Sequence, residues 1–462
     1  MTTLTQDIAG FVAHAQGLTV PPKALDTIRN GFIDTFATMM AGRNDPAVHV
    51  VRRHARAKSL GTRPGHATGA DEGLDSAAAA LIDGTAAHAL DFDDVALSGH
   101  PSTVLVPAIL AEGRRLESTG AQAIRAYLAG YETWAELVAR EPDPYHSKGW
   151  HPTAVLGTMA ATAAVASLNG LSTMQCAEAL GLAASMASGL VANFGTMTKP
   201  LHAGRAAANA IEAVQLVLLG MSAARDVLEH DRGYLAALSP GGRADRRSPA
   251  DMLGQRLRIL TQGLSIKRYP VCYAAHRAID GTLALADGRG VTPGRIESIE
   301  VQIGPAQDAM LRNRSARTGL EAKFSLEFVL ACALIVRKVG LAELNDAFVA
   351  RADVQALMGR VRRHIVHTQC PIEPVFALHD RVRIRLADGQ ALDTGDIRYA
   401  RGNAQAPLSA DEIREKFMDC AAHGGFAGGA ARLYDELLRL EQLDALPSLP
   451  PPDGDGLASP TP

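Results

Sequence analysis

The first half of the chain repeats one pattern, in which apolar residues recur at steps of three and four positions. This spacing places apolar side chains on one face of an α-helix, whereas a β-strand would show strict alternation. The pair Asn169-Gly170 is typical of a helix end and Ser172 of a helix start, so the connections are short. We therefore expect one all-helical domain over residues 1–265. The predicted helices cover residues 24–41, 77–89, 121–140, 153–168, 173–190 and 203–219.

The pattern changes after about residue 264. Residues 296–303 and 382–386 alternate apolar and polar side chains, as half-buried strands do, and helical segments are predicted between them over 324–336 and 341–348. This mixture predicts a smaller α+β lid domain over residues 266–400. A last helix over 410–421 predicts that residues 401–445 return to the helical domain, and the proline- and glycine-rich residues 446–462 are expected to form a disordered tail. The expected fold class is mainly α, with a large all-helical domain plus this lid.

The composition of the chain argues against several classes of partner and site. The net charge is −3 over 462 residues, which argues against a nucleic-acid partner, because phosphate binding needs a concentrated basic surface. The five cysteines lie far apart and form no C-x-x-C pair, which predicts neither a disulfide framework nor a zinc or iron–sulfur site. The N-terminus shows no secretory signal, and no apolar run is long enough to span a bilayer. We expect a cytoplasmic protein without a membrane segment.

Four common signatures of enzyme chemistry are absent from the sequence. They are the phosphate-binding G-x-x-x-x-G-K-[ST], a dinucleotide-binding G-x-G-x-x-G after a strand, the zinc-binding H-E-x-x-H and the hydrolase G-x-S-x-G. Their absence removes the corresponding enzyme classes, and we expect chemistry that uses neither a nucleotide cofactor nor a metal.

Three predicted helix starts carry a basic residue immediately before a proline: His100, His151 and Lys199. Proline favours the first helical turn and disfavours helical conformation in the residue before it, so each basic side chain should lie beside the positive helix end. Such an end attracts carboxylates and lowers the pKa of a nearby imidazole or amine, which can then accept a proton. A single helix start with a basic residue before proline commonly has only a structural role. Three in one low-charge region indicate a site that binds anions and transfers protons.

An acidic cluster precedes His100 in the sequence His88-Ala-Leu-Asp91-Phe-Asp93-Asp94. If the preceding helix continues, Asp91 neighbours both His88 and Asp94, while Asp93 points elsewhere. Asp91 would then orient a catalytic histidine or lysine. Two alternatives stay open: the carboxylates could bind a divalent cation, which prefers oxygen ligands, or they could serve only as caps and ion pairs.

The segment Lys267-Arg268-Tyr-Pro-Val-Cys272 lies at the predicted domain boundary, where ligand sites are common. Lys267 and Arg268 are candidates for binding carboxylates. Cys272 could act as a nucleophile beside His276, although a buried apolar filler is the commoner role for such a cysteine.

A further candidate segment, Glu321-Ala-Lys323-Phe-Ser325, begins a predicted helix. Ser325 suits the helix cap, and Lys323 or Ser325 could reach the substrate. A plain helix start explains these residues equally well.

Together these segments resemble the MmgE/PrpD family, which includes 2-methylcitrate dehydratase, cis-aconitate decarboxylase and iminodisuccinate epimerase. The resemblance implies a helical domain with an α+β lid, a homodimer, an active site between the domains, and no redox cofactor or general metal requirement. It also implies that Asp91, His100, His151, Lys199, Lys267 and Cys272 surround the substrate. The resembling stretches follow the family order: HALDFDD at 88–94, GHPS at 99–102, GWHPTAVLGTMAA at 149–161, TMTKPLHAGRAA at 196–207, KRYPVC at 267–272 with His276, EAKFS at 321–325 and PLSADEIREKF at 407–417.

Three departures from the family pattern bear on the reaction. Val95 replaces a threonine that often follows the acidic cluster, and Phe328 replaces a tyrosine of some members. Cys272 stands where the decarboxylase has a histidine, which makes decarboxylation less favoured.

The shared chemistry implied by the family is removal of a proton next to a carboxylate of a small polycarboxylate. We expect His151 or Lys199 to be the base and His100 the opposing acid, with substrate carboxylates held by Lys267 and Arg268. The leading prediction is a cofactor-independent, dehydratase-like lyase of a di- or tricarboxylate. An epimerase of a dicarboxylate such as iminodisuccinate is the first alternative. A cis-aconitate-type decarboxylase or a non-catalytic carboxylate-binding protein is the second.

Overall fold

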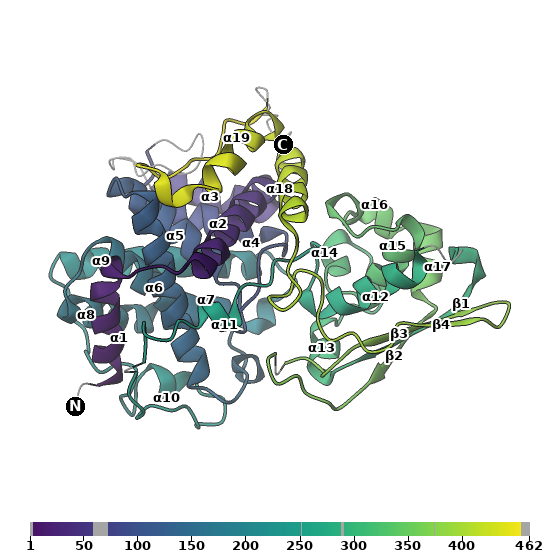
Figure 1. Ribbon diagram of the computed structural model, residues 1–462, viewed down its shortest axis with the longest axis horizontal. Coiled ribbons are helices and arrows are strands. Elements are labelled where there is room, and N and C mark those ends of the chain that lie inside the picture. The colour runs from purple at the N-terminus through teal and green to yellow at the C-terminus, as the bar shows by residue number, and fades with distance from the viewer. Residues whose placement is uncertain (1–2, 59–72, 251, 288–290, 374, 454–462) are drawn as a thin grey trace. The chain divides into compact units, whose positions relative to one another are not determined.

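The computed structural model describes residues 3–58, 73–250, 252–287, 291–373 and 375–453. The chain divides into unit 1, formed by residues 1–266 and 409–462, and unit 2, formed by residues 267–408. Every named strand in the described residues belongs to unit 2 (Figure 1). The predicted fold class, mainly α with a large helical domain and a smaller α+β domain, is therefore confirmed.

Unit 1 is built from helices, most of them joined by short connections, with longer ones before and after α10. Its longest helices follow the predicted ones closely, because the apolar spacing that marks them is continuous. The helices are α1 (Leu4–His14), α2 (Pro22–Gly42), α3 (Pro46–Lys58), α4 (Ser76–Ala89), α5 (Ser102–Arg115), α6 (Gly120–Ala139), α7 (Pro152–Leu168), α8 (Thr173–Met186), α9 (Thr198–Leu218), α10 (Tyr234–Leu238), α11 (Ile259–Gln262), α18 (Ala410–Gly424) and α19 (Ala427–Leu437).

Helix α7 forms the centre of unit 1. It is apolar around its whole circumference and is buried from Pro152 to Ser167, and it packs against α5, α6, α8 and α9. Alanine dominates its sequence, PTAVLGTMAATAAVASL, and small side chains allow neighbouring helices to approach closely. The start of α7 therefore lies at a fixed place deep in the unit.

Helices α4 and α9 approach each other closely through two glycines. A Cβ atom on Gly84 would lie 2.7 Å from the Cα of Gly204, and one on Gly204 would lie 2.1 Å from the carbonyl oxygen of Leu81. Only glycine fits at this contact. The contact sets the distance between the end of α4, which carries His88, and the first turns of α9, which carry Lys199.

Unit 2 contains a four-stranded sheet with strand order β2-β1-β3-β4. Strand β1 (Ile296–Ile303) pairs with β2 (Val361–Ile365) in parallel and with β3 (Arg381–Leu386) antiparallel, and β4 (Ala391–Asp393) pairs antiparallel with β3. In Figure 1, α12 and α15 lie over the sheet, and α12 contacts β3. The helices of unit 2 are α12 (His276–Ala286), α13 (Pro305–Met310), α14 (Gly319–Ala322), α15 (Leu326–Val336), α16 (Asp346–Val349) and α17 (Ala352–Met358).

Three sequence-based expectations about elements need correction. The helix expected over 341–348 is two short pieces, Leu341–Glu343 and α16, because Asn345 breaks the run and caps α16. Strand β2 was not predicted, since its sequence VRRHI puts three basic residues in a row and leaves an edge strand with little apolar alternation. Helix α8 ends at Met186 rather than at residue 190, where Leu190 instead forms a β-bridge with Trp150.

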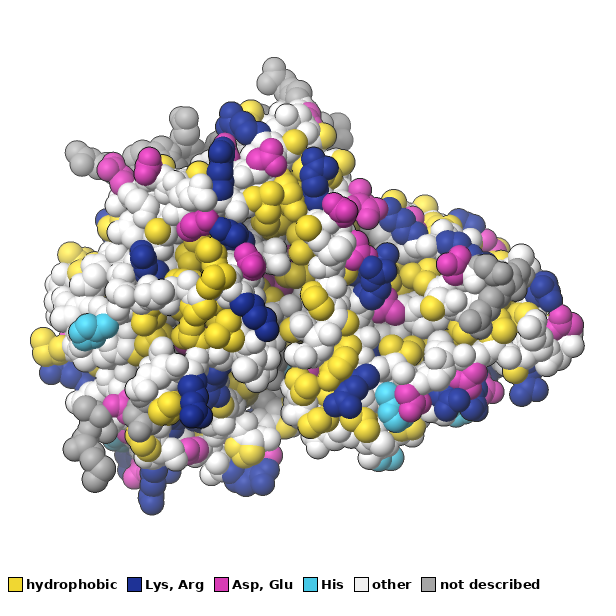
Figure 2. Space-filling view, in the orientation of Figure 1, with side chains coloured by type: hydrophobic (Ala, Val, Ile, Leu, Met, Phe, Trp, Pro, Cys, Tyr) yellow, Lys and Arg dark blue, Asp and Glu magenta, His cyan; other side chains and the backbone are white. Residues whose placement is uncertain are grey.

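After unit 2 the chain rejoins unit 1 through α18, which packs along α2. In the segment expected to be a disordered tail, Leu446 and Leu449 are buried, and residues 454–462 lie outside the described residues. Among the described helices, none combines the length and the apolar character needed to cross a bilayer. On the face shown in Figure 2, Lys and Arg side chains are interspersed with Asp and Glu side chains.

Candidate active site

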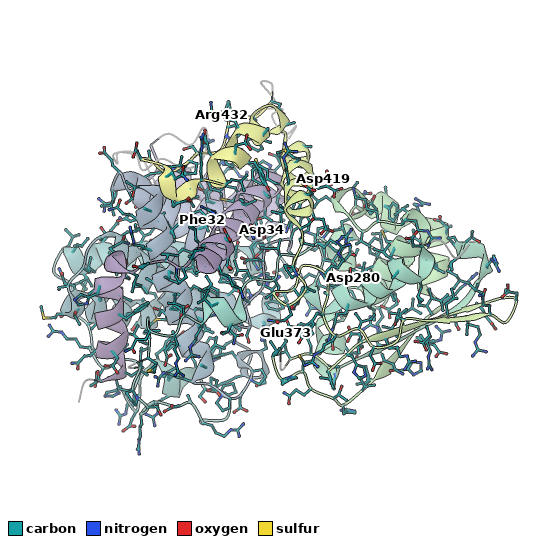
Figure 3. The ribbon with its side chains drawn as sticks, viewed as in Figure 1. Phe32, Asp34, Asp280, Glu373, Asp419 and Arg432 are labelled. Atoms are coloured by element: carbon teal, nitrogen blue, oxygen red, sulfur yellow. The ribbon has the colours of Figure 1, made fainter. Side chains whose placement is uncertain are left out.

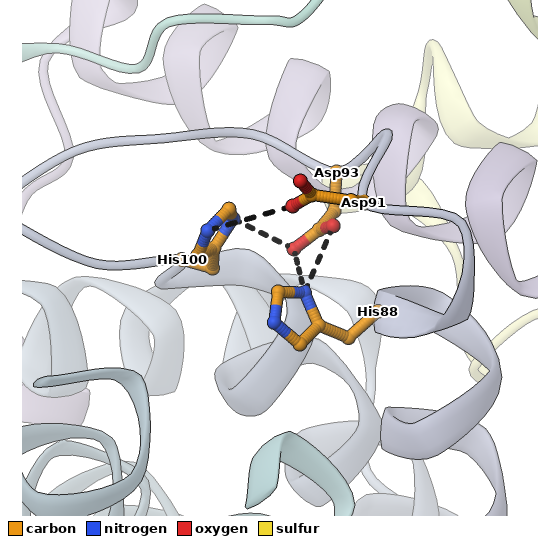
Figure 4. A group of neighbouring side chains, drawn as sticks. All are labelled: His88, Asp91, Asp93 and His100. Carbon is orange, nitrogen blue, oxygen red and sulfur yellow. Dashed lines mark hydrogen bonds and ion pairs between the residues drawn. The ribbon is translucent and has the colours of Figure 1, made fainter. Parts of the chain in front are cut away.

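The turn between α4 and α5 carries the acidic residues of the candidate site. Helix α4 ends at Ala89, and Asp91 takes a left-handed backbone conformation with φ of +53°, so the helix does not continue through Asp94. The condition under which Asp91 would neighbour both His88 and Asp94, a helix that continues past Ala89, is therefore not met. The sharp turn brings Asp93, rather than Asp91, against His88 (Figure 4).

Asp93 lies between two imidazoles. Its carboxylate oxygens are 2.9 and 3.0 Å from Nδ1 of His88, and its Oδ2 is 3.0 Å from Nδ1 of His100 (Figure 4). Nδ1 of His100 is also 2.9 Å from the carbonyl oxygen of Asp94. Since all these neighbours are acceptors, both Nδ1 atoms carry the proton, and the other ring nitrogen of each histidine is left to accept one.

The second pair of the site joins Asp91 to Lys199. Nζ of Lys199 is 2.8 Å from Oδ1 of Asp91 and 5.5 Å from the ring centroid of Phe194. Nε2 of His100 faces the same Asp91 oxygen at 4.0 Å. Helix α9 begins at Thr198, so Lys199 lies inside the first turn, and the expectation that it precedes the helix is wrong.

His151 is the N-cap residue of α7, as the sequence predicts for a residue before proline. Its Nδ1 is 3.0 Å from Nδ1 of His202, its ring stacks on His88 with centroids 6.0 Å apart, and Phe194 meets it edge-on at 4.8 Å. Of the two Nδ1 atoms one must donate and the other accept, and burial lowers the pKa of both His151 and His202, which favours a neutral pair.

Burial sets the charges of this group. It lowers the pKa of His88 to about 3, and it is also the main cause of the strongly lowered pKa of His151, so both imidazoles are neutral near pH 7. Burial would raise the pKa of Asp93, but the imidazoles of His88 and His100 hold it well below its usual value. Burial, together with the nearby Asp34, keeps the pKa of Asp94 well above its usual value. Asp93 is thus the carboxylate of this turn whose charged form the surrounding imidazoles stabilise.

We call His88, Asp91, Asp93, His100, His151, Lys199 and His202 the His–Asp cluster. The side chains of His88 and Asp93 are 0% and 1% exposed, whereas those of His100, Lys199 and Asp91 are 13%, 8% and 7% exposed. The more accessible side of the cluster is therefore formed by His100, Lys199 and Asp91, whereas His88 and Asp93 are more deeply buried. This arrangement can exchange a proton at Nε2 of His100 and stabilise negative charge beside the Lys199 ammonium.

Four members of the cluster could act as ligands of a cation. His88, Asp91, Asp93 and His100 each offer an atom, and these atoms lie within 4.8 Å of one another. However, Lys199 already neutralises Asp91, and both histidines direct Nδ1 protons at Asp93. A metal would have to displace the ammonium and both protons, so the residues fit a proton-transfer site better than a metal site.

Three of the predicted substrate-binding residues meet in unit 2 near the start of α15. The amide N–H of Cys272 donates to the carbonyl oxygen of Lys323 at 2.9 Å, which joins two segments far apart in the sequence. Ser325 is the N-cap of α15, and its hydroxyl accepts the Phe328 amide N–H at 3.2 Å. The helix-cap interpretation of Ser325 is confirmed.

The other predicted residues of unit 2 lie along the segment that leads into α12. Lys267 begins the unit, and the guanidinium of Arg268 lies 5.9 Å from the ring centroid of Tyr269. His276 is the first residue of α12, and its Nε2 lies 3.2 Å from the carbonyl oxygen of Val271.

Sequence reasoning did not place His88, Asp93 or His202 among the site residues. His88 and Asp93 belong to the motif HALDFDD, but the assumed helix directed Asp93 away from His88. His202 follows Lys199 by three residues, a spacing that makes neighbours within one helical turn. That spacing was a usable signal, provided that the helix was known to start before Lys199.

Comparisons with known proteins agree with this architecture. Residues 6–247 match the family model of the MmgE/PrpD N-terminal domain, and residues 269–440 match that of the MmgE/PrpD C-terminal domain. Cis-aconitate decarboxylase of Mus musculus is 28% identical over 90% of this chain and 86% of its own length. Cis-aconitate decarboxylase of Homo sapiens is 27% identical over 88% of this chain and 86% of its own length. Cis-aconitate decarboxylase of Aspergillus terreus is 23% identical over 95% and 94%, respectively.

Proposed function

The chain belongs to the MmgE/PrpD family, and on that premise we propose that it is a lyase that transfers a proton at the carbon next to a carboxylate of a small di- or tricarboxylate. The observation that carries this proposal is the orientation of His100. Asp93 and the Asp94 carbonyl fix its Nδ1 proton, so Nε2 is the atom free to exchange a proton, beside the Asp91–Lys199 pair.

The contacts support a division of roles that differs from the one expected from the sequence. We assign His100 as the group that exchanges the proton, because a buried carboxylate orients it and stabilises its protonated form. Lys199, paired with Asp91, is assigned the role of stabilising the enediolate-like charge that develops on the substrate carboxylate. His151, neutral and buried at the start of α7, is assigned as the second proton-transfer group. Lys267 and Arg268 stay proposed carboxylate-binding residues.

Two lyase reactions fit this chemistry. In decarboxylation with a shift of the double bond, the bond to one carboxylate breaks and carbon dioxide leaves. The carbon at the far end of the allylic system then takes a proton that Nε2 of His100 has accepted from solvent. In dehydration, Nε2 of His100 removes a proton from carbon, and the neighbouring hydroxyl takes up a proton from solvent or from the second proton-transfer group and leaves as water. The similarity to cis-aconitate decarboxylases favours decarboxylation, and it makes cis-aconitate the first substrate to test. Dehydration is the second candidate, because the family resemblance implies that Cys272 occupies the position at which the decarboxylase carries histidine.

A substrate panel tests the proposal. The purified chain is incubated separately with cis-aconitate, citrate, 2-methylcitrate and iminodisuccinate. Released carbon dioxide, the ultraviolet absorbance of a conjugated alkene, and proton NMR then separate decarboxylation, dehydration and epimerisation. We expect carbon dioxide or a new alkene from at least one tricarboxylate. Binding of these compounds without any chemical change would instead support a carboxylate-binding protein.

A further inference from the structure

Lys416 is a buried cation that the proposed reaction does not use. It lies on α18, in the last part of the chain, and its side chain is 6% exposed. Its Nζ is 2.6 Å from Oδ1 of Asp34 on α2, 2.7 Å from the carbonyl oxygen of Phe92, and 4.0 Å from the centroid of the Phe92 ring. Figure 3 labels Asp34 on α2, the helix that packs along α18. One ammonium therefore ties two helices to the residue between Asp91 and Asp93.

The turn held by Lys416 has a strained backbone. Asp91, Leu97 and Ser98 have φ angles of +53°, +52° and +62°, a region that residues other than glycine seldom adopt. Such conformations persist only where surrounding contacts determine them, and they are found preferentially at functional sites. The Phe92 carbonyl lies inside this turn, so its bond to Lys416 is one of the contacts that can hold Asp91 in place.

The other end of the turn is fixed from α5. The carboxylate of Asp94 accepts the amide N–H of Ser102 at 3.2 Å and also the Ser102 hydroxyl, which in turn lies 2.7 Å from the hydroxyl of Tyr127. The backbone of Val95 pairs with that of Ser265 at 2.9 Å in both directions. Lys416 is thus one of the contacts that hold the Asp91–Asp93 end, through the Phe92 backbone, whereas Ser102 and Ser265 hold the opposite end.

Lys416 also balances a buried negative charge. Burial raises the pKa of Asp34, and the charge of Lys416 opposes that rise. Asp93 and Asp94 face the same region, together with Cys420 on α18 and Tyr127 on α6. Without Lys416, a charged Asp34 would lose the ammonium that lies 2.6 Å away, and its repulsion would act on Asp93.

We propose that Lys416 is a positioning residue for the His–Asp cluster, which fixes the turn at Phe92 so that Asp91 meets Lys199 and Asp93 meets His100. Lys416 does not touch the reacting groups in this role. The catalytic part of the proposal rests on the proposed function, whereas the positioning part does not.

The test uses the full chain and four variants. Lys416→Met removes the ammonium at similar length, and Lys416→Arg keeps the charge and hydrogen-bond donors. The double variant Lys416→Met/Asp34→Asn removes both charges, so that no unpaired ion destabilises the fold. The matched control is Arg140→Met, which breaks a buried pair of Arg140 with Glu136 at 2.6 Å elsewhere in unit 1. Each variant is assayed for turnover, KM and thermal unfolding, and crystal structures of the two Lys416→Met variants are determined.

We expect kcat of both Lys416→Met variants to fall by about 100-fold with a small change in KM, because a misplacement of about 1 Å has that effect on catalysis. Lys416→Arg should recover part of the loss, and Arg140→Met should stay within about twofold of wild type, since distant sites act independently.

The proposal is overturned if the double variant is folded and keeps wild-type kcat, or if Arg140→Met loses as much kcat as the Lys416→Met variants. If no substrate is turned over by wild type, the proposed function fails, and the crystal structures decide alone. A broken Asp91–Lys199 pair in the variants supports the positioning role, and an unchanged turn overturns it.

Discussion

Nδ1 of His100 lies 3.0 Å from Oδ2 of Asp93 and donates its proton to that buried carboxylate. This hydrogen bond decides which atom of His100 can take part in chemistry, because it leaves Nε2 as the only ring nitrogen without a fixed proton. The same bond stabilises the imidazolium that forms when Nε2 accepts a proton. Among the side chains of His100, Asp91 and Asp93, that of His100 is the most exposed, at 13%. The pair therefore combines a buried orienting group with an accessible reactive atom.

Replacing Asp93 by asparagine should lower kcat/KM by about 10³-fold or more, because the amide no longer fixes the tautomer of His100 or stabilises its charge. Steady-state kinetics on the substrate found in the panel provide the measurement. Glu178→Gln is a suitable control, since it weakens an ion pair with Arg225 at 2.6 Å on α8, away from the cluster. Equal losses in the two variants would show that Asp93 has no special role.

The pair of Asp91 and Lys199 should behave as one unit. We expect Asp91→Asn and Lys199→Met each to lower kcat/KM by about 100-fold, because either change removes the oriented ammonium from the reacting carboxylate. The double variant should lose little more than the single variants, since the second change removes an interaction already broken. A double-mutant cycle measures this coupling. Fully additive losses would mean that the 2.8 Å contact is not used in catalysis.

The glycine contact between α4 and α9 gives a prediction about stability. Gly204→Ala should lower the free energy of unfolding by about 1–3 kcal/mol, because the new Cβ would lie 2.1 Å from the carbonyl oxygen of Leu81 and the helices must move apart. Gly10→Ala in α1 is the matched control. A Cβ there meets nothing within 4 Å, so this change should be neutral or stabilising by up to about 1 kcal/mol. Urea denaturation of both variants checks the difference, and similar stabilities would refute the close contact.

The half-buried His146 should make stability depend on pH. Burial, together with the charges of His100 and Lys199, lowers its pKa from 6.5 to about 4. Between these values the unfolded chain binds a proton that the folded chain refuses, so acidification destabilises the fold, and the stability is fully present only above pH 6.5.

His146→Gln removes this dependence. The free energy of unfolding of the variant, minus that of wild type, should therefore increase as the pH falls from 6.5 towards 4. The increase should be at most about 1.4 kcal/mol per pH unit. Denaturation curves of both proteins at several pH values give this difference. Parallel pH dependences would show that His146 titrates normally in the folded state.

The sequence predicted the helices of unit 1 well, because continuous apolar spacing and helix-boundary residues act locally. It also identified His100, His151, Lys199 and Asp91 as site candidates, since basic residues before proline and a nearby acidic run are visible in one dimension. The sequence did not predict contacts that depend on backbone angles or on the packing of distant segments. The left-handed conformation of Asp91 reverses which carboxylate meets His88, and nothing in HALDFDD specifies that angle. Lys416 and Asp34 are separated by almost the whole chain, so only the fold can bring them together.

The central claim is that His100 exchanges a proton with carbon through Nε2, and deuterium transfer tests it most directly. Wild type and His100→Asn are incubated with cis-aconitate and the other panel compounds in deuterated water, and carbon-bound deuterium is followed by NMR. Asparagine keeps an amide donor near Asp93 but has no atom in place of Nε2. We predict that wild type places solvent deuterium on carbon in the product or in recovered substrate, and that His100→Asn does so at least about 100-fold more slowly. Equal rates of deuterium incorporation in the two proteins, or decarboxylation by wild type without any carbon-bound deuterium, would contradict the account.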